Sequence, residues 1–161
     1  MEGQDEGLRL ARIVALATPL ALLGGAYVSQ YGFGLYPCEM CWWQRWPHFA
    51  ALALALLGFV IRPVRLLVGL AGAAIAVSGL IGGFHAGVEY GWWEGLTACT
   101  TNTLAPGADP LDAILAAPLV RCDVAPWSLL GISLAGWNFL FSLASALVIA
   151  LFLARGRRTR N

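Results

Sequence analysis

The stretch IVALATPLALLGGAYVSQYGFGLYP, which runs from Ile13 to Pro37, contains no charged residue. A transmembrane α-helix needs about 20 consecutive apolar residues, and this stretch is long enough to supply them. Three further stretches without charged residues follow along the chain: Trp46–Ile61, Leu66–Val88 and Val124–Ala154. The second is short for a span unless its helix begins near Cys41, which would place Arg45 about one turn inside the helix. The pattern predicts four spanning helices.

The composition of the chain is that of an integral membrane protein. Of its 161 residues, 59% are hydrophobic and only 12% are charged, and the mean hydropathy is +0.72. A soluble domain usually carries about twice that charged fraction, and a chain of this length needs a largely polar surface to remain in water. We therefore exclude a soluble enzyme, a nucleic-acid-binding protein and a disordered chain. We expect residues 1–161 to form a single membrane domain.

Arginine residues, which supply all the basic side chains, define the predicted orientation. Most of them fall at the chain ends or between the second and third stretches, positions that share one face of a four-span protein: Arg9, Arg12, Arg62, Arg65, Arg155, Arg157, Arg158 and Arg160. Basic residues next to spans mark the cytoplasmic side, so both termini are predicted to be cytoplasmic. The chain starts with acidic rather than basic residues, so we expect no cleaved signal peptide and a first helix that stays in the membrane.

We expect an all-α bundle with helices at about 13–31, 41–61, 65–88 and 127–154 and two loops on the outer face. The first loop, at about 32–40, is short. The second, at about 89–126, is long, and long loops without obvious structure are more often functional or disordered than simple connections. Within it, Asp109–Ala117 has the pattern of a capped helix start. This pattern predicts either a short helix on the membrane surface or a loop segment packed onto the bundle.

All four cysteines fall on the predicted outer face. Cys38 and Cys41 form a Cys-x-x-Cys pair before the second helix, and Cys99 and Cys122 lie in the long loop. Disulfides persist in compartments outside the cytoplasm, so the four could form two structural disulfides, a zinc site or a redox relay. A Cys-x-x-Cys pair closes too small a ring to stabilise a fold much. Exposed, strained disulfides are suited to exchange, so we favour the relay and expect no metal.

The residues after Cys41 favour a reactive thiol. Arg45 and His48 follow at spacings that put all three residues on one helical face, and a guanidinium beside a thiol promotes the nucleophilic thiolate. An alternative is that Arg45 only snorkels to anchor the helix end. Gln44 offers hydrogen-bonding groups at the same depth. Pro47 could kink the helix and disturb this alignment.

His85 is expected at the outer end of the third helix, level with Cys41 and Arg45. It could contact a bound electron acceptor or deliver a proton, or it could be an interfacial histidine bonded to a loop carbonyl. Five tryptophans gather near the same boundary, as in an aromatic belt: Trp42, Trp43, Trp46, Trp92 and Trp93. Stacking on a ring-shaped acceptor is the alternative for these side chains.

The decapeptide YPCEMCWWQR, Tyr36 to Arg45, resembles the Pro-Cys-x-x-Cys-x-x-Gln-Arg signature of the DsbB family of bacterial disulfide-forming proteins. The resemblance covers nearly the whole chain, with four spans, internal termini and one cysteine pair in each outer loop. It implies an enzyme of the bacterial inner membrane, a thiol:quinone oxidoreductase active on the periplasmic side. Such an enzyme reoxidises a thioredoxin-fold dithiol oxidase of the DsbA type and passes two electrons to membrane quinone, either ubiquinone or menaquinone.

The resemblance also implies roles for particular residues. Cys99 would be attacked by the reduced partner, and Cys122 would either leave or attack Cys38 to give a transient Cys38–Cys122 link between the loops. This step would free Cys41 as a thiolate beside the quinone, where Arg45, with Gln44 and His85 close by, would bind the quinone ring.

Two alternatives come from other classes of protein. A vitamin K epoxide reductase-like enzyme also couples thiols to quinones, but its quinone-proximal Cys-x-x-Cys pair lies late in the bundle rather than before the second helix. A non-catalytic membrane subunit would use the two cysteine pairs only as structural disulfides.

Overall fold

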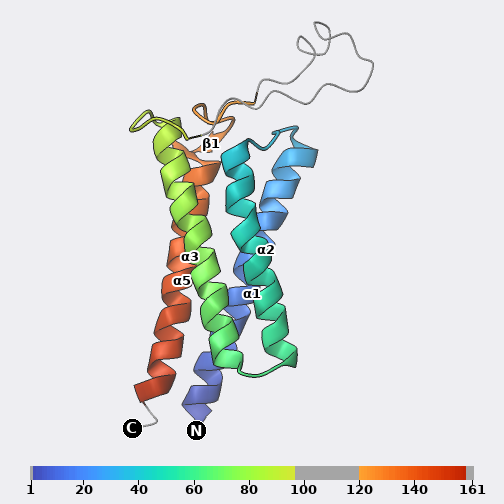
Figure 1. Ribbon diagram of the computed structural model, residues 1–161, viewed down its shortest axis with the longest axis vertical. Coiled ribbons are helices and arrows are strands. Elements are labelled where there is room, and N and C mark those ends of the chain that lie inside the picture. The colour runs from blue at the N-terminus through green and yellow to red at the C-terminus, as the bar shows by residue number, and fades with distance from the viewer. Residues whose placement is uncertain (1, 97–119, 159–161) are drawn as a thin grey trace, which may run out of the picture.

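The computed structural model describes residues 2–96 and 120–158, in which the four predicted long helices are present. They are α1 (Glu2–Gly32), α2 (Glu39–Val60), α3 (Val64–Glu89) and α5 (Leu134–Arg158). In Figure 1 the start of α1 and the end of α5 lie at the same end of the bundle. The Cys-x-x-Cys pair, at the start of α2, lies at the opposite end.

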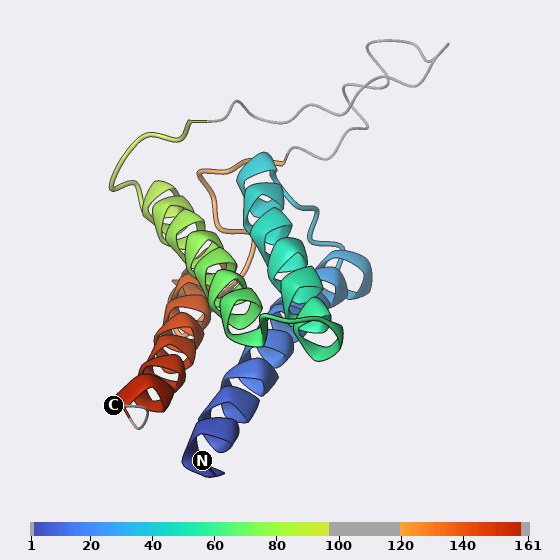
Figure 2. The same ribbon diagram turned by 60° about the horizontal axis from the view of Figure 1, so that its bottom comes forward.

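The helices form a four-membered ring in cross-section. Each of the four helices packs mainly against two neighbours, in the order α1, α2, α3, α5 and back to α1, and α1 and α3 also touch each other. Figure 2, an oblique view with the end that holds the termini tilted forward, shows this order. The lower half of the bundle is packed with small and branched apolar side chains, among them Ala11, Ala51, Val68, Ile75 and Ile149.

Three of the helices are long and apolar enough to cross a membrane: Glu6–Gly32 within α1, Val64–Glu89, and Leu134–Arg155 within α5. These spans make the chain a multi-pass membrane protein. α2 has 22 residues and runs alongside the other helices (Figure 1), but its first half carries polar side chains. Its buried residues include Gln44, Arg45 and His48, which the neighbouring helices cover.

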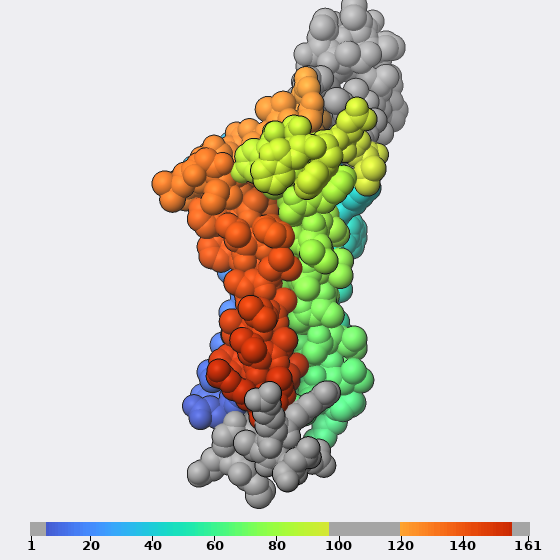
Figure 3. All heavy atoms as spheres, turned by 90° about the vertical axis from the view of Figure 1, so that its left-hand side faces the viewer, coloured from blue at the N-terminus to red at the C-terminus, as the bar shows by residue number. Residues whose placement is uncertain are grey.

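Glycines let α3 and α5 approach each other closely. A Cβ atom added at Gly79 would lie 2.9 Å from Cβ of Ser142, and one added at Gly82 would lie 2.9 Å from the carbonyl oxygen of Ala135. Helices in membranes pack closely through small residues of this kind. Figure 3 shows the resulting face, in which α3 and α5 lie side by side along the bundle.

The fourth helix begins later than the sequence predicts. Instead of a helix from about 127, a two-stranded antiparallel hairpin precedes Leu134, with β1 (Ser128–Leu129) paired to β2 (Ile132–Ser133). Its two-residue turn, Leu130 and Gly131, has positive φ at both positions, as tight hairpins require. Because this stretch is apolar and uncharged, hydropathy alone assigns it to the helix and does not indicate the turn.

The hairpin is attached to the end of α3 by a tyrosine. The hydroxyl group of Tyr90 donates to the carbonyl oxygen of Gly131 at 3.0 Å and accepts from the backbone N–H of Ser133 at 3.0 Å. The hairpin is thereby held at the cysteine end of the bundle. The predicted surface helix at Asp109–Ala117 lies outside the described residues, and so does Cys99.

Candidate redox site at the membrane surface

The first cysteine pair lies at the N-terminus of α2. Cys38 is the N-cap residue with an extended backbone, and its sulfur accepts a hydrogen bond from the backbone N–H of Cys41 at 3.2 Å. The two sulfur atoms are 2.7 Å apart. The Cys-x-x-Cys spacing therefore brings both thiols together at the first helical turn, as the sequence predicts.

The sulfur of Cys38 contacts two side chains, the thiol of Cys41 and the imidazole of His85. The pKa of its thiol is raised well above the ordinary value, because it shares a hydrogen bond with Cys41 and is buried. Nε2 of His85, from the outer end of α3, lies 3.6 Å from the same sulfur and 3.8 Å from Oε1 of Glu89. The helix ends of α2 and α3 thus place an imidazole directly beside the pair.

A cysteine of the long loop packs against the first pair. Cys122 is buried and belongs to one apolar cluster with Cys38, Met40 and Val88. The loop returns to the bundle at this point, since Cys122 lies 84 residues after Cys38 in the sequence. The exposed side chains of Arg121 and Asp123 pair on either side of it, with Arg121 Nε 2.8 Å from Asp123 Oδ1. This contact lowers the pKa of the Asp123 carboxyl group.

Beneath Cys41 lies a cavity of about 240 Å³ that is bounded by all four helices. Its α2 wall consists of Cys41, Gln44, Arg45 and His48, while α1 and α5 contribute mostly apolar side chains. The four α2 residues share one face even though Pro47 lies inside the helix. An apolar cavity with a few converging polar groups is the usual form of a small-molecule site.

Arg45 is buried and held by α1. Its guanidinium donates to Oε1 of Gln30 at 2.7 Å and to the carbonyl oxygen of Ala26 at 3.3 Å. It also lies over the rings of Tyr27 and Trp42, at 5.0 and 4.9 Å from their centroids. A charged group at membrane depth needs such partners, and they fix the guanidinium at the cavity wall.

A network of buried amides joins the three other helices behind the cavity. Gln44 donates from Nε2 to Nδ1 of His85 at 2.8 Å and to the carbonyl oxygen of Met40 at 3.2 Å. Nδ2 of Asn138 donates to Oε1 of Gln44 at 2.8 Å and to the carbonyl oxygen of Ser78 at 3.1 Å. Gln44 thus connects His85, which lies beside the cysteine pair, to Asn138 in the interior of the bundle.

The network continues to His48. Nε2 of His48 lies 2.9 Å from Oδ1 of Asn138, which also accepts from the hydroxyl group of Ser142 at 3.0 Å. Sequence reasoning missed Asn138, Ser78 and Ser142. The only available signal for Asn138 was a strongly polar side chain inside an otherwise apolar stretch, which marks interhelical hydrogen bonding.

Comparison with known proteins agrees with this geometry. The family model "Disulfide bond formation protein DsbB" matches residues 8–152. The chain belongs to the DsbB family. It is 35% identical over 164 residues to a disulfide bond formation protein B of Verminephrobacter eiseniae, with 93% of this chain and 88% of that protein covered. A protein of the same name from Polaromonas is 29% identical over 159 residues, covering 94% of each chain. No solved structure matches the chain.

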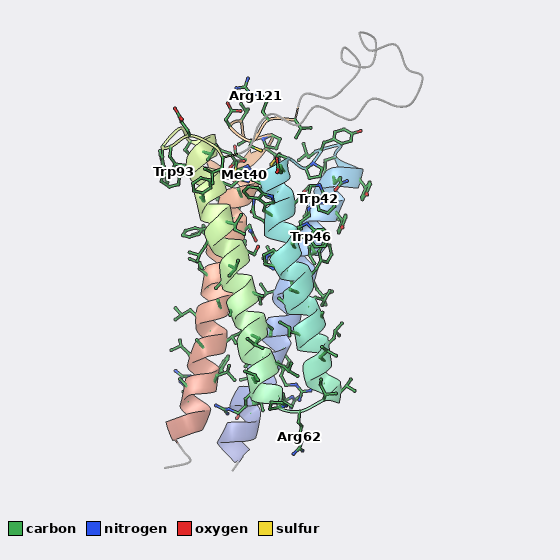
Figure 4. All side chains as sticks on the ribbon, in the orientation of Figure 1. Met40, Trp42, Trp46, Arg62, Trp93 and Arg121 are labelled. Carbon is green, nitrogen blue, oxygen red and sulfur yellow. The ribbon has the colours of Figure 1, made fainter. Side chains whose placement is uncertain are left out.

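Several aromatic side chains lie towards the cysteine end of this DsbB-family protein. Figure 4 shows Trp42, Trp46 and Trp93 towards the cysteine end and Arg62 at the opposite end of the bundle. Trp46 and Trp93 are exposed, as expected for side chains in an interfacial belt. The indole N–H of Trp93 donates to the carbonyl oxygen of Phe84 at 2.9 Å, which folds the start of the long loop back onto α3.

Cys38, Cys41 and His85 also form a group that could hold a metal ion. Their ligand atoms all lie within 4.8 Å of one another. A closed structural zinc site uses four protein ligands, and the described residues bring three together here. The sulfur separation of 2.7 Å suits a disulfide-forming pair better than two ligands spread around a tetrahedral ion, which stand farther apart. The donor set therefore fits thiol chemistry better than zinc binding.

Proposed function

We propose that this protein is a thiol:quinone oxidoreductase of the bacterial inner membrane, with its site on the periplasmic side and both termini in the cytoplasm. In this arrangement α2 is the fourth span. The enzyme would reoxidise a thioredoxin-fold dithiol oxidase of the DsbA type and pass two electrons to membrane quinone. The observation that carries the proposal is the position of Cys41, which belongs to a close cysteine pair and also lines an apolar cavity between the helices.

The residues around the cavity fit a quinone. Its walls are apolar, and Arg45 provides a fixed cation for a carbonyl oxygen that becomes more negative on reduction. When bound, the quinone would supply the acceptor for two electrons and two protons. Arg45, Gln44 and His85 are the residues proposed to hold and orient it, and all three line the cavity.

The relay begins with the outer cysteine pair. A thiolate of the reduced partner attacks Cys99 of a Cys99–Cys122 disulfide, and Cys122 leaves as a thiolate. Cys122 then attacks Cys38 of the Cys38–Cys41 disulfide, and the sulfur of Cys41 leaves with the electron pair. The packing of Cys122 against Cys38 supports this order, because attack requires the two sulfurs to meet.

The relay closes in two further exchanges. The second thiol of the partner attacks its mixed disulfide with Cys99, which completes the partner's disulfide and releases Cys99. Cys99 then attacks Cys122, and Cys38 is released. Cys38 and Cys41 are then both reduced, and a quinone held by Arg45, Gln44 and His85 would accept their two electrons so that the inner disulfide forms again. The two protons lost by the partner would balance those taken up by the quinone.

Quinone reduction by the purified protein tests the proposal. The native protein in detergent, mixed with a reduced DsbA-type oxidase and a short-chain ubiquinone or menaquinone, should consume one quinone per partner disulfide formed. Cys41→Ser should abolish quinone consumption while the protein stays folded. A structural-disulfide subunit would instead lose thermal stability on this substitution and show no quinone consumption in its native form. Bound zinc at one ion per chain, with Cys38 and Cys41 resistant to alkylation, would also overturn the proposal.

A further inference from the structure

His48 presents an unsatisfied nitrogen atom in the wall of the cavity. The residue is buried, with 3% of its surface exposed, and it lines the cavity two helical turns below Cys41. Within the described residues, its Nδ1 atom has no hydrogen-bond partner. Buried polar atoms are rarely left without a partner, so this atom points to a group that the cavity receives.

The amide network determines which ring nitrogen of His48 carries the proton. Nδ2 of Asn138 faces the carbonyl oxygen of Ser78, which can only accept, so this end of the Asn138 amide is the donor. The opposite end, Oδ1, must therefore be an acceptor, and it faces Nε2 of His48 at 2.9 Å. A neutral imidazole has one N–H group, which in His48 lies on Nε2.

Nδ1 of His48 is consequently a hydrogen-bond acceptor. A quinone carbonyl can only accept hydrogen bonds and gains nothing from another acceptor, whereas the hydroxyl group of the reduced quinol can donate to it. Trp137, which lines the same cavity, has an indole N–H without a partner in the described residues. A hydroxyl group can use both, because it donates one hydrogen bond and accepts others.

We propose that His48 recognises the reduced form of the electron acceptor, so that the cavity binds the quinol more tightly than the quinone. The inference rests on the proposed function and assigns a residue that discriminates between the two redox states. A site that favours the reduced form favours the transfer of electrons from Cys41, because differential affinity for two states shifts the equilibrium between them.

The test separates the two nitrogens of His48. In His48→Gln the side-chain amide can still reach Asn138 from the position of Nε2, but nothing replaces Nδ1. Dissociation constants for a short-chain ubiquinone and for its quinol are measured by tryptophan fluorescence under anaerobic conditions, in a Cys41→Ser background that blocks electron transfer. Ser142→Ala is the matched control, since it removes a hydroxyl group that contacts Oδ1 of Asn138 at 3.0 Å and Nε2 of His48 at 3.5 Å, leaves Nδ1 of His48 in place and lies outside the cavity lining.

We expect His48→Gln to weaken quinol binding about three- to tenfold, which is the value of one ordinary hydrogen bond, and to change quinone binding less than twofold. Ser142→Ala should leave the ratio of the two constants unchanged. Equal weakening of both forms, or of neither, would overturn the role of His48 while leaving the proposed function standing. If the Cys41→Ser protein and the native protein both fail to bind quinone, the proposed function itself is wrong, and this inference falls with it.

Discussion

Nδ1 of His85 accepts a hydrogen bond from Nε2 of Gln44 at 2.8 Å. This contact places the proton of a neutral His85 ring on Nε2, the atom that faces the sulfur of Cys38 and the carboxylate of Glu89. His85 can therefore donate a hydrogen bond to Cys38 as the inner disulfide opens. The hydrogen bond made by one ring nitrogen of a histidine determines whether the other nitrogen carries the proton. In His85 that hydrogen bond comes from Gln44.

Gln44→Leu should slow quinone reduction about tenfold. The substitution leaves Nδ1 of His85 without its partner, and an unsatisfied buried group costs about 1–3 kcal/mol. Nδ2 of Asn138 loses one bond but still donates to the carbonyl oxygen of Ser78. The measurement is the loss of quinone absorbance with a reduced partner oxidase. Trp46→Phe, on the exposed side of the same helix, is the control and should retain the native rate. A native rate in folded Gln44→Leu would show that the orientation of His85 is irrelevant to the reaction.

Arg45→Ala should raise the KM for quinone about ten- to a hundredfold, since a hydrogen bond to a charged group contributes about 1.5–3 kcal/mol. Exchange between the partner and Cys99 should continue at the native rate, because Arg45 lies on the cavity wall rather than at the outer pair. Steady-state kinetics with varied quinone measure the first effect, and trapping of the mixed disulfide measures the second. Arg62→Ala, at the far end of the bundle (Figure 4), should change neither. An unchanged KM for Arg45→Ala would assign the guanidinium to anchoring α2 on α1.

Gly82→Ala should destabilise the bundle by about 1–3 kcal/mol, the usual cost of overpacking. Its Cβ atom would lie 2.9 Å from the carbonyl oxygen of Ala135, 2.9 Å from Nδ2 of Asn138 and 3.1 Å from Oε1 of Gln44. The midpoint of thermal unfolding in detergent reports the change. Gly24→Ala, where nothing lies within 4 Å of the new methyl group, is the matched control and should leave the midpoint unchanged or raise it. Equal midpoints for the two variants would contradict the close packing of α3 on α5.

The two thiols of the inner pair should differ in reactivity with pH. The raised pKa of Cys38 means that this thiol carries less thiolate than an ordinary cysteine at every pH below its pKa. In the reduced protein, alkylation at Cys38 should therefore remain slow from neutral pH to about pH 9, the range in which a free thiol becomes reactive. Mass spectrometry after short exposure to iodoacetamide measures this, with Cys41→Ala as the control that removes the shared hydrogen bond and should speed alkylation of Cys38. Fast alkylation of Cys38 at neutral pH in the native protein would contradict it.

The number of helices could be predicted because charges are largely excluded from membrane spans, but their starts could not: α1 begins at Glu2 rather than near residue 13, since a helix can continue through charged residues beyond its apolar part. The stretch from Ile13 to Pro37 and its three counterparts therefore indicated the number of helices, and the cysteine spacing indicated the pair at the start of α2. The hairpin at residues 128–133 was not predictable in this way, since its strands are as apolar as the helix that follows. Hydropathy cannot distinguish the two, and Gly131 alone marked the turn.

The partners of the site residues could not be predicted either. Arg45 clearly needed a partner, but the choice of Gln30 and Ala26 depends on how α1 rotates against α2. The same holds for Asn138, whose contact with Gln44 is set by the glycines that draw α5 towards α3. Sequence periodicity indicates which residues share one face of a helix. The rotation and the axial shift of one helix against its neighbour, which decide the contacts between residues, depend on packing.

The polar face of α2 has a consequence for biogenesis. Gln44, Arg45 and His48 are buried only because α1, α3 and α5 supply their partners. A helix bearing these three residues enters lipid unfavourably by itself, because polar and charged side chains within a span are costly without partners. Only residues 61–63 separate α2 from α3, which is strongly apolar. If α2 is the fourth span, it therefore depends on both sides of the chain: α1, synthesised before it, supplies the partners of Arg45, and α3 and α5, synthesised after it, supply those of Gln44 and His48.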